Sequence, residues 1–331
     1  MPLRLRGGGS KDFYGNEPRG EVLDTRAYCG IVDYEPSELV LTARCGTPLA
    51  EVEQALAGRG QCLPFEPPHF GAATLGGCVA AGLSGPRRAA AGALRDFVLG
   101  VKLVDGKGRE LAFGGQVMKN VAGYDVSRLV AGSLGTLGLI AEASLKVLPR
   151  PATEMTLQLE MPQPRALDAM NRWAGQPLAV SATAWYDGLC SVRLSGAAVA
   201  VKSAAAAIGG GELEQADAFW STIREQTHPF FSCSTLWRIA VPSVTPALDL
   251  PGTQLIEWGG GLRWLSSGAP ATAVREAARR AGGHATLFRA ADKSAGAFQP
   301  LEPVPARLHR ALKHTFDPAG IFNPGRLYPE L

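Results

Sequence analysis

The first 148 residues alternate short strand patterns with short helical patterns. In 38–46 apolar residues occur at every second position, which is the period of a β-strand with one buried face. In 47–58 they recur three and four positions apart, so we predict a helix that follows an N-cap at Thr47. Residues 101–113 predict a β-hairpin, and 139–147 alternate again as a half-buried strand.

Two prolines within 147–154 interrupt this pattern, and a different order of elements follows. Across 152–300 the patterns read strand, helix, two strands and helix, and then a further helix, three strands and a last helix. This order predicts an α+β domain of ferredoxin-like type and is compatible with two related halves. We therefore divide the chain into a first domain over 1–148, a second domain over 152–300 and a C-terminal tail over 301–331.

The composition is typical of a folded protein and argues against two kinds of partner. Of the 331 residues 46% are hydrophobic, and 33 basic with 30 acidic residues give a net charge of +3. The basic residues form no block, so nucleic acid is not an expected partner. No apolar run approaches the roughly 18 to 20 residues that span a bilayer. Nor do the first residues contain an apolar signal region, so we expect a soluble cytoplasmic protein, peripheral to the inner membrane only through partners.

Six cysteines are spread along the chain without a CxxC pair. This spacing argues against a zinc ribbon or a ferredoxin-type cluster held by this chain, and no metal site is expected. We predict reduced thiols that are buried as small apolar side chains. The positions are Cys29, Cys45, Cys62, Cys78, Cys190 and Cys233.

The stretch RGGGSK, at residues 6–11, has two interpretations. Successive N–H groups of a glycine loop can converge on a phosphate, and Ser10 and Lys11 would add a hydroxyl donor and a positive charge. The alternative is a flexible N-terminal linker. Two further glycine-rich segments, 66–100 and 119–151, favour the first interpretation because three such segments separated by strands are hard to explain as linkers.

The three glycine segments do not match the common nucleotide-binding motifs. None has GxGxxG after a strand, so a Rossmann site is not supported, and none has GxxxxGK[ST], so a P-loop is not supported either. From the residues alone we infer a dinucleotide or another phosphorylated ligand on an unusual glycine scaffold.

At these segments the chain resembles the FAD-binding domain of the vanillyl-alcohol oxidase or PCMH-type family. The resemblance rests on RGGGSK, on ATLGG at 73–77, on VAGYD…GSLGTLGLIAEASLKV at 121–147 and on DPAGIFNPGRLY at 317–328. Finer features such as CLPFEPPHFG and AGGHATLFR are similar to the FAD-binding subunits of bacterial glycolate oxidases. The resemblance implies a PCMH-type domain of two α/β subdomains and a ferredoxin-like cap domain. The C-terminal tail would return to the FAD domain.

The resemblance also implies which residues hold FAD. The loop at 7–11 would cradle the pyrophosphate, 74–85 would line the adenosine diphosphate and ribityl path, and 135–140 would hold the flavin. Asn323 with Gly325 would close over the isoalloxazine ring. Arg95 and Asp96, like Lys119, Asn120 and Tyr124, have either a cofactor role or a structural one, such as an ion pair that supports the loop. The implied cofactor residues are Gly7, Gly8, Gly9, Ser10, Lys11, Thr74, Gly76, Gly77, Ser84, Gly85, Arg95, Asp96, Gly135, Gly138, Ile140 and Asn323.

Three departures from the family pattern bear on mechanism. The loop at 7–11 has no histidine for a covalent flavin bond, so we expect noncovalent FAD. The loop begins within the first ten residues, which implies a domain without the strand and helix that relatives place before it. The HxGDxNxH-like metal motif of related 2-hydroxy acid dehydrogenases is absent, and the nearest sequence holds only His284.

Oxidation of a 2-hydroxy acid requires a group that accepts the hydroxyl proton and a cation that binds the carboxylate. Four residues are candidates for these catalytic roles: His284, Arg289, Arg263 and His69. The alternative for each is a structural role, since isolated histidines and arginines often satisfy buried carbonyls.

The resemblance implies the FAD-binding subunit of a heteromeric glycolate oxidase that oxidises glycolate, and also D-lactate, to the 2-oxo acid. Its partners would be a homologous catalytic flavin subunit and an iron–sulfur subunit, because this chain has no cluster ligands to pass electrons onward. Two alternatives stay open: a self-sufficient FAD-dependent 2-hydroxy acid oxidoreductase, and a flavin-free scaffold subunit of the same complex. Flavin content distinguishes the scaffold, and activity of the isolated chain distinguishes the other two.

Overall fold

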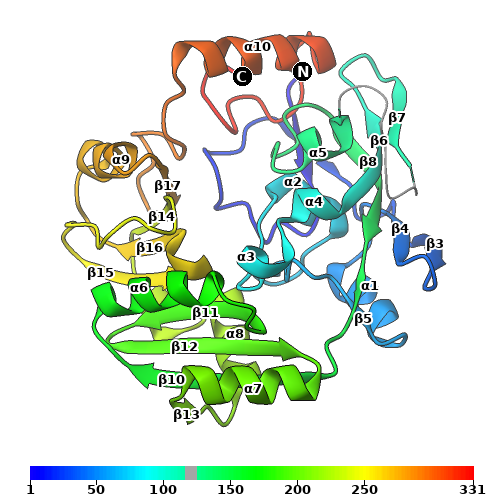
Figure 1. The fold of residues 1–331 in the computed structure, drawn as a ribbon. Helices are drawn as coiled ribbons and strands as arrows, with labels where there is room; N and C mark the ends of the chain where they lie inside the picture. The colour runs from blue at the N-terminus through cyan, green and yellow to red at the C-terminus, as the bar shows by residue number, and fades with distance from the viewer. Residues whose placement is uncertain (116–124) are drawn as a thin grey trace. The chain divides into compact units, whose positions relative to one another are not determined.

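The computed structural model describes residues 1–115 and 125–331, so Lys119, Asn120 and Tyr124 lie outside the described residues. The chain forms two compact units (Figure 1). The first comprises Met1–Ser84, Gly92–Arg150 and Gly296–Leu331, and the second comprises Gly85–Ala91 and Pro151–Ala295. Each unit is therefore assembled from segments that are distant in the sequence.

The first unit contains a five-stranded antiparallel sheet in the order β3-β4-β8-β6-β7. Its strands are β3 (Ile31–Glu35), β4 (Val40–Arg44), β6 (Val98–Val104), β7 (Glu110–Gly114) and β8 (Leu139–Lys146). The predicted hairpin is present as β6 and β7. The half-buried pattern expected for β4 and β8 is wrong, because both are inner strands with runs of four buried residues, which places both strand faces out of solvent.

Short helices and strand pairs complete this unit. The helices are α1 (Leu49–Ala57), α2 (Leu75–Ala81), α4 (Leu94–Phe97) and α5 (Val126–Val130), and the pairs are β1 (Leu3–Arg6) with β2 (Glu21–Asp24) and β5 (Gln61–Cys62) with β9 (Leu148–Pro149). Helix α1 buries Leu49, Val52 and Leu56, as its spacing predicts. Thr47 is not its N-cap. The Thr47 hydroxyl instead accepts from Gly30 N at 2.8 Å, and this contact closes the loop before the helix.

The C-terminal tail returns to the first strand of the chain. Helix α10 (Pro303–Phe316) ends at a turn, after which Leu3 N donates to Ile321 O at 2.6 Å and Asn323 N donates to Leu3 O at 2.9 Å. Figure 1 shows both ends of the chain close to α10. The first unit is thus closed by contacts between the beginning and the end of the sequence.

A buried ion pair holds the turn between α10 and the tail. The Lys313 ammonium lies 2.7 Å from the Asp317 carboxylate and also donates to Thr136 O at 2.8 Å and to Phe322 O at 2.9 Å. Asp317 in turn accepts from the Ile321 and Phe322 N–H groups. All three ammonium donors are therefore satisfied inside the protein, and the tail is fixed to the loop that contains Thr136.

The second unit is an eight-stranded antiparallel sheet in the order β13-β10-β12-β11-β15-β16-β14-β17. Its strands are β10 (Thr153–Glu160), β11 (Val180–Tyr186), β12 (Leu189–Gly196), β13 (Gly211–Glu212), β14 (Leu236–Ala240), β15 (Thr253–Glu257), β16 (Leu262–Ser266) and β17 (His284–Arg289). Its helices are α3 (Arg88–Ala91), α6 (Gln163–Ala174), α7 (Ala198–Ile208), α8 (Ala216–Arg224) and α9 (Ala271–Arg280), with short 3-10 turns η1 (Pro229–Phe231) and η2 (Trp258–Gly260).

This sheet consists of two halves with the same strand order. In β10 to β13, and again in β14 to β17, the first and third strands lie together, flanked by the fourth and the second. The halves meet where β11 pairs with β15. Helix α6 follows the first strand in one half, whereas a loop over 241–252 replaces it in the other. The order confirms the ferredoxin-like α+β expectation and shows its internal repeat.

Candidate functional site

The glycine-rich segments of the first unit converge on one groove. Its volume is about 840 Å³ when the open side of the groove is included. Residues 4–12 form one wall, and parts of 74–81 and 134–140 form the others, together with Asn323 and Arg326 of the tail. The groove therefore draws on the beginning, the middle and the end of the chain.

Gly8 and Gly76 are among the glycines of the groove that have no room for a side chain. A Cβ on Gly8 would overlap the carbonyl oxygen of Ala72. A Cβ on Gly76 would lie 2.8 Å from the Cβ of Cys45 and 2.9 Å from its carbonyl oxygen. Backbone packs against backbone at both positions, which brings main-chain atoms of two segments to the same groove.

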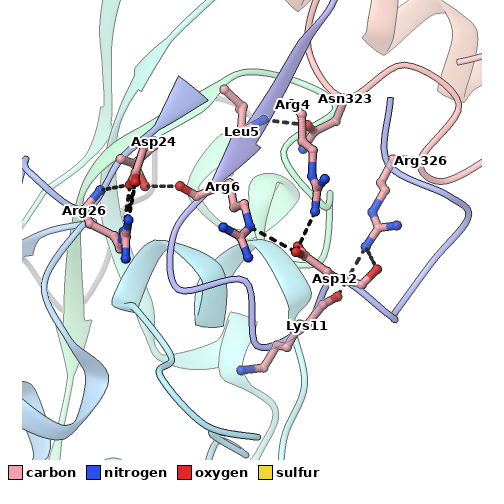
Figure 2. Close-up of polar contacts among 10 residues, drawn as sticks. Arg4, Leu5, Arg6, Lys11, Asp12, Asp24, Arg26, Asn323 and Arg326 are labelled. Atoms are coloured by element: carbon pink, nitrogen blue, oxygen red, sulfur yellow. Dashed lines mark hydrogen bonds and ion pairs between the residues drawn. The ribbon is translucent and has the colours of Figure 1, made fainter. Parts of the chain in front are cut away.

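Basic side chains surround the loop at 7–11. Arg4 and Arg6 alternate on β1, point to the same side and share one carboxylate, with distances of 2.6 Å and 3.0 Å to Asp12 Oδ2 (Figure 2). The Lys11 ammonium extends away from this cluster and donates to His69 O at 3.2 Å (Figure 2). With Arg326, four cations line the groove, and Asp12 supplies the one carboxylate among the described residues that line it. An excess of positive charge of this kind suits a phosphorylated ligand.

The tail residues join these walls to one another. Asn323 accepts from Leu5 N at 2.8 Å and donates to Leu134 O at 2.6 Å, so its carboxamide connects β1 with the third glycine segment. The Arg326 guanidinium donates to Asp12 O at 2.8 Å, to Lys11 O at 3.3 Å and to Asn16 O (Figure 2). Burial lowers the pKa of Arg326 to about 10.

Comparison with known proteins agrees with this geometry. Residues 1–114 match the model of the FAD binding domain family. The glycolate oxidase subunit GlcE of Escherichia coli is 51% identical over the whole chain, which covers 93% of that protein. The chain belongs to the GlcE family of glycolate oxidase subunits. The glycolate oxidase subunit GlcD of Bacillus subtilis is 33% identical over 47% of the chain and 34% of that protein.

The fold of this GlcE-family protein is that of the PCMH-type flavoproteins. A solved alkyldihydroxyacetonephosphate synthase structure superposes with a TM-score of 0.68 over 98% of this chain and 72% of that one, at 16% identity. At that identity the likeness bears on the fold alone. It agrees with the expected FAD domain and α+β domain.

The residues of the groove fit FAD. Among the described residues, Arg4 Nε is a buried donor without a hydrogen-bond partner, and it belongs to a residue that lines the groove. A buried donor that lacks a partner is costly unless a ligand satisfies it. The glycine walls and the surplus of cations suit the pyrophosphate of FAD, and the cofactor is the group that accepts hydride when bound.

Arg326 was not predicted from the sequence, and its substitution provides a direct test. In Arg326→Lys a single ammonium replaces the planar guanidinium and can no longer donate to the three carbonyls of residues 11, 12 and 16. We expect the Kd for FAD to rise about tenfold or more, since a hydrogen bond to a charged group is worth about 1.5–3 kcal/mol. The measurement is fluorescence titration of the FAD-free chain.

The exposed Arg310 of α10 provides the matched control, because Arg310→Lys makes the same chemical change without touching the groove. If the Kd for FAD were unchanged in both Arg326→Lys and Arg310→Lys, the hydrogen bonds from Arg326 to the loop carbonyls would not be needed for FAD binding.

Most of the cofactor residues that the sequence predicts line this groove, whereas four of them do not. The Ser84 hydroxyl accepts from Leu94 N at 3.1 Å, and Gly85 belongs to the second unit. Arg95 and Asp96 lie 4.0 Å apart with side chains that are 66% and 47% exposed. The Asp96 carboxylate accepts from Ala93 N and so caps the short helix α4. A cofactor role for these four stays a prediction, as does closure over the ring by Asn323 and Gly325.

Two of the candidate catalytic arginines are occupied by the protein itself. Arg263 is fully buried and donates to Gly260 O and Thr245 O, both at 2.7 Å, and burial lowers its pKa to about 10. Arg289 donates to Phe231 O at 3.1 Å and to Gln226 Oε1 at 2.7 Å. These contacts are those of the structural alternative.

The two candidate histidines lie in different surroundings. His69 Nε2 lies 3.0 Å from Glu53 Oε2 in the first unit, and its carbonyl accepts from Lys11. His284 begins β17 in the second unit. Packing around its imidazole and repulsion from Arg238 and Arg88 lower its pKa. His284 thus lies beside two further cationic groups.

The cysteines give a prediction about reactivity. Burial raises the pKa of Cys45, and it raises the pKa of Cys78 and Cys190 to about 12, whereas Cys29 is exposed, contrary to the expectation that all six are buried. The thiolate is the nucleophile, so at pH 8 iodoacetamide should modify Cys29 and leave these three thiols intact. Peptide mapping by mass spectrometry measures this, and rapid labelling of Cys78 in the native chain would contradict it.

Proposed function

We propose that this chain is the FAD-binding subunit of a heteromeric glycolate oxidase, which oxidises glycolate, and also D-lactate, to the 2-oxo acid. The observation that carries the proposal is the match to GlcE over the whole chain, together with a groove whose residues fit FAD. It is an FAD-dependent oxidoreductase subunit. When bound, FAD would accept a hydride from the substrate, and a base would take the hydroxyl proton.

We propose that FAD is held without a covalent bond. The loop at 7–11 consists of three glycines, a serine and a lysine, none of which matches the histidine that links flavin in covalent relatives. The chain's own residues have a positioning task in this proposal. Arg4, Arg6 and Arg326 orient the loop and neutralise the pyrophosphate, while Asn323 holds the third glycine segment against β1.

The proposed partners are a homologous catalytic flavin subunit and an iron–sulfur subunit that receives the electrons. Similarity to a second glycolate oxidase subunit, GlcD, over about half of the chain supports a complex that contains two related flavin domains. No helix among the described residues is long and apolar enough to cross a bilayer. We propose a cytoplasmic location, with any contact with the inner membrane made through these partners.

The test is the absorption spectrum of the purified chain, followed by acid precipitation. We expect flavin bands in the native protein and FAD in the supernatant. Flavin that stays with the pellet would reject noncovalent binding, and a colourless chain that takes up no added FAD would favour the scaffold alternative. Glycolate oxidation with an artificial acceptor, measured with the chain alone and after mixing with its complex partners, then separates a self-sufficient enzyme from a subunit.

A further inference from the structure

Two arginines from separate segments of the second unit lie beside Trp258, and His284 lies near both of them. The Arg88 guanidinium of α3 lies 4.5 Å from the centroid of the Trp258 ring, and that of Arg238 on β14 lies 5.3 Å from it. His284 on β17 pairs with Ala240, two residues after Arg238 on β14, so that His284 and Arg238 project from the same face of the sheet. His284 is an exposed residue, although its surroundings still desolvate the imidazole in part.

Hydrogen bonds hold both the indole of Trp258 and the backbone that follows it. Trp258 Nε1 donates to Gly85 O at 3.0 Å, and the following Gly259 N donates to Thr183 Oγ1 at 2.9 Å. Trp258 itself has a φ of 55°, a left-handed conformation that is strained for a bulky residue. Strained residues that the surrounding structure holds in place occur preferentially at ligand sites. The indole is therefore a preorganised platform for the guanidinium groups.

The cluster has a surplus of positive charge. The neighbouring Arg87 is paired with Glu154 at 2.8 Å, whereas no carboxylate of the described residues forms an ion pair with Arg238. Repulsion from Arg238 and Arg88 contributes to the lowered pKa of His284, after the larger effect of burial, so the imidazole is neutral near pH 7. Two cations thus lie next to a group that can either donate or accept a hydrogen bond.

We propose that Arg88, Arg238, His284 and Trp258 form a binding site for the carboxylate of a small 2-hydroxy or 2-oxo acid. A planar guanidinium binds a carboxylate through two parallel hydrogen bonds, and stacking on the indole orients its plane. The neutral imidazole suits the neighbouring oxygen, either as an acceptor for a 2-hydroxyl or as a donor to a 2-oxo group. The choice of this substrate class rests on the proposed function.

The test is isothermal titration of the flavin-loaded chain with oxalate, a planar two-carbon acid that cannot donate hydride. We expect saturable binding that weakens at least tenfold in Arg238→Gln and in Arg88→Gln, with partial recovery in Arg238→Lys, which keeps the charge but loses the fork. The matched control is Arg280→Gln, which removes an exposed arginine of α9 in the same unit and should leave the affinity unchanged. An unaltered flavin spectrum and circular dichroism spectrum would verify that each variant is folded.

Several outcomes would overturn this proposal. The first is that the native chain does not bind oxalate. The second is that Arg238→Gln and Arg88→Gln both bind oxalate with native affinity. The third is that inorganic phosphate binds as tightly as oxalate, which would show that the site has no preference for a planar carboxylate. The two proposals fail separately. A chain that holds FAD but binds no oxalate rejects this site only, whereas a flavin-free chain with Arg238-dependent oxalate binding rejects the proposed function only.

Discussion

Gly8→Ala should severely weaken the binding of FAD. The new methyl group would overlap the carbonyl oxygen of Ala72, which is main chain and cannot move aside as a side chain can. Either the loop at 7–11 or the segment before α2 must shift, and both line the groove. We expect the Kd for FAD to rise by at least about 100-fold, which corresponds to about 2.7 kcal/mol or more. Fluorescence titration of the FAD-free chain measures this.

Gly115→Ala is the control for this change. It adds the same methyl group in the same unit at a position where no atom of the described residues lies within 4 Å of the new Cβ. Its affinity for FAD should equal that of the native chain. If Gly8→Ala also kept native affinity for FAD, the loop at 7–11 and the segment before α2 could separate without harm to the site. The close backbone packing would then not be needed for FAD binding.

Lys313→Met should strongly destabilise the FAD-binding unit. The substitution removes the cation that faces Asp317, a residue that is only 1% exposed, and it leaves the carbonyls of Thr136 and Phe322 without their donor. Loss of one partner from a buried ion pair typically costs about 3–5 kcal/mol. The free energy of unfolding in urea, followed by the fluorescence of flavin released from this unit, should fall by that amount.

The exposed Lys202 on α7 allows the same substitution without a buried partner. Lys202→Met is expected to change the stability by less than about 0.5 kcal/mol. The double variant Lys313→Met/Asp317→Leu should recover part of the loss, because it also removes the isolated charge. If Lys313→Met proves as mild as Lys202→Met, the ion pair does not hold the tail in place.

The glycine segments could be predicted as parts of a ligand site because three such segments separated by strands are hard to explain as linkers. Gly7, Gly76 and Gly135 come from three segments, and the structure brings them to one groove. Arg326 and Arg4 were not predicted, since a guanidinium that donates to backbone carbonyls leaves no pattern in the side chains of its partners. The alternating arginines of RLRGGG were the only available signal for Arg4.

For the candidate catalytic residues, in contrast, the sequence could not distinguish a catalytic role from a structural one. Arg263 and Arg289 looked equivalent to any other isolated arginine in the sequence, and only the chain path around Gly260 and Gln226 shows where their donors are directed. Arg238 was not predicted from the sequence because its neighbours in the cluster, Arg88 and His284, are 150 and 46 residues away. Strand register sets that proximity, and register over such distances cannot be read from local periodicity.

The return of the tail to the first strand sets an order of events during biosynthesis. The carbonyls of Lys11 and Asp12 leave the ribosome early, whereas Arg326, which binds them, follows more than 300 residues later. At about 5–20 residues per second this interval is on the order of tens of seconds. The nascent chain therefore carries an unfinished groove for most of its synthesis, and cofactor insertion belongs to the period after translation has passed the tail.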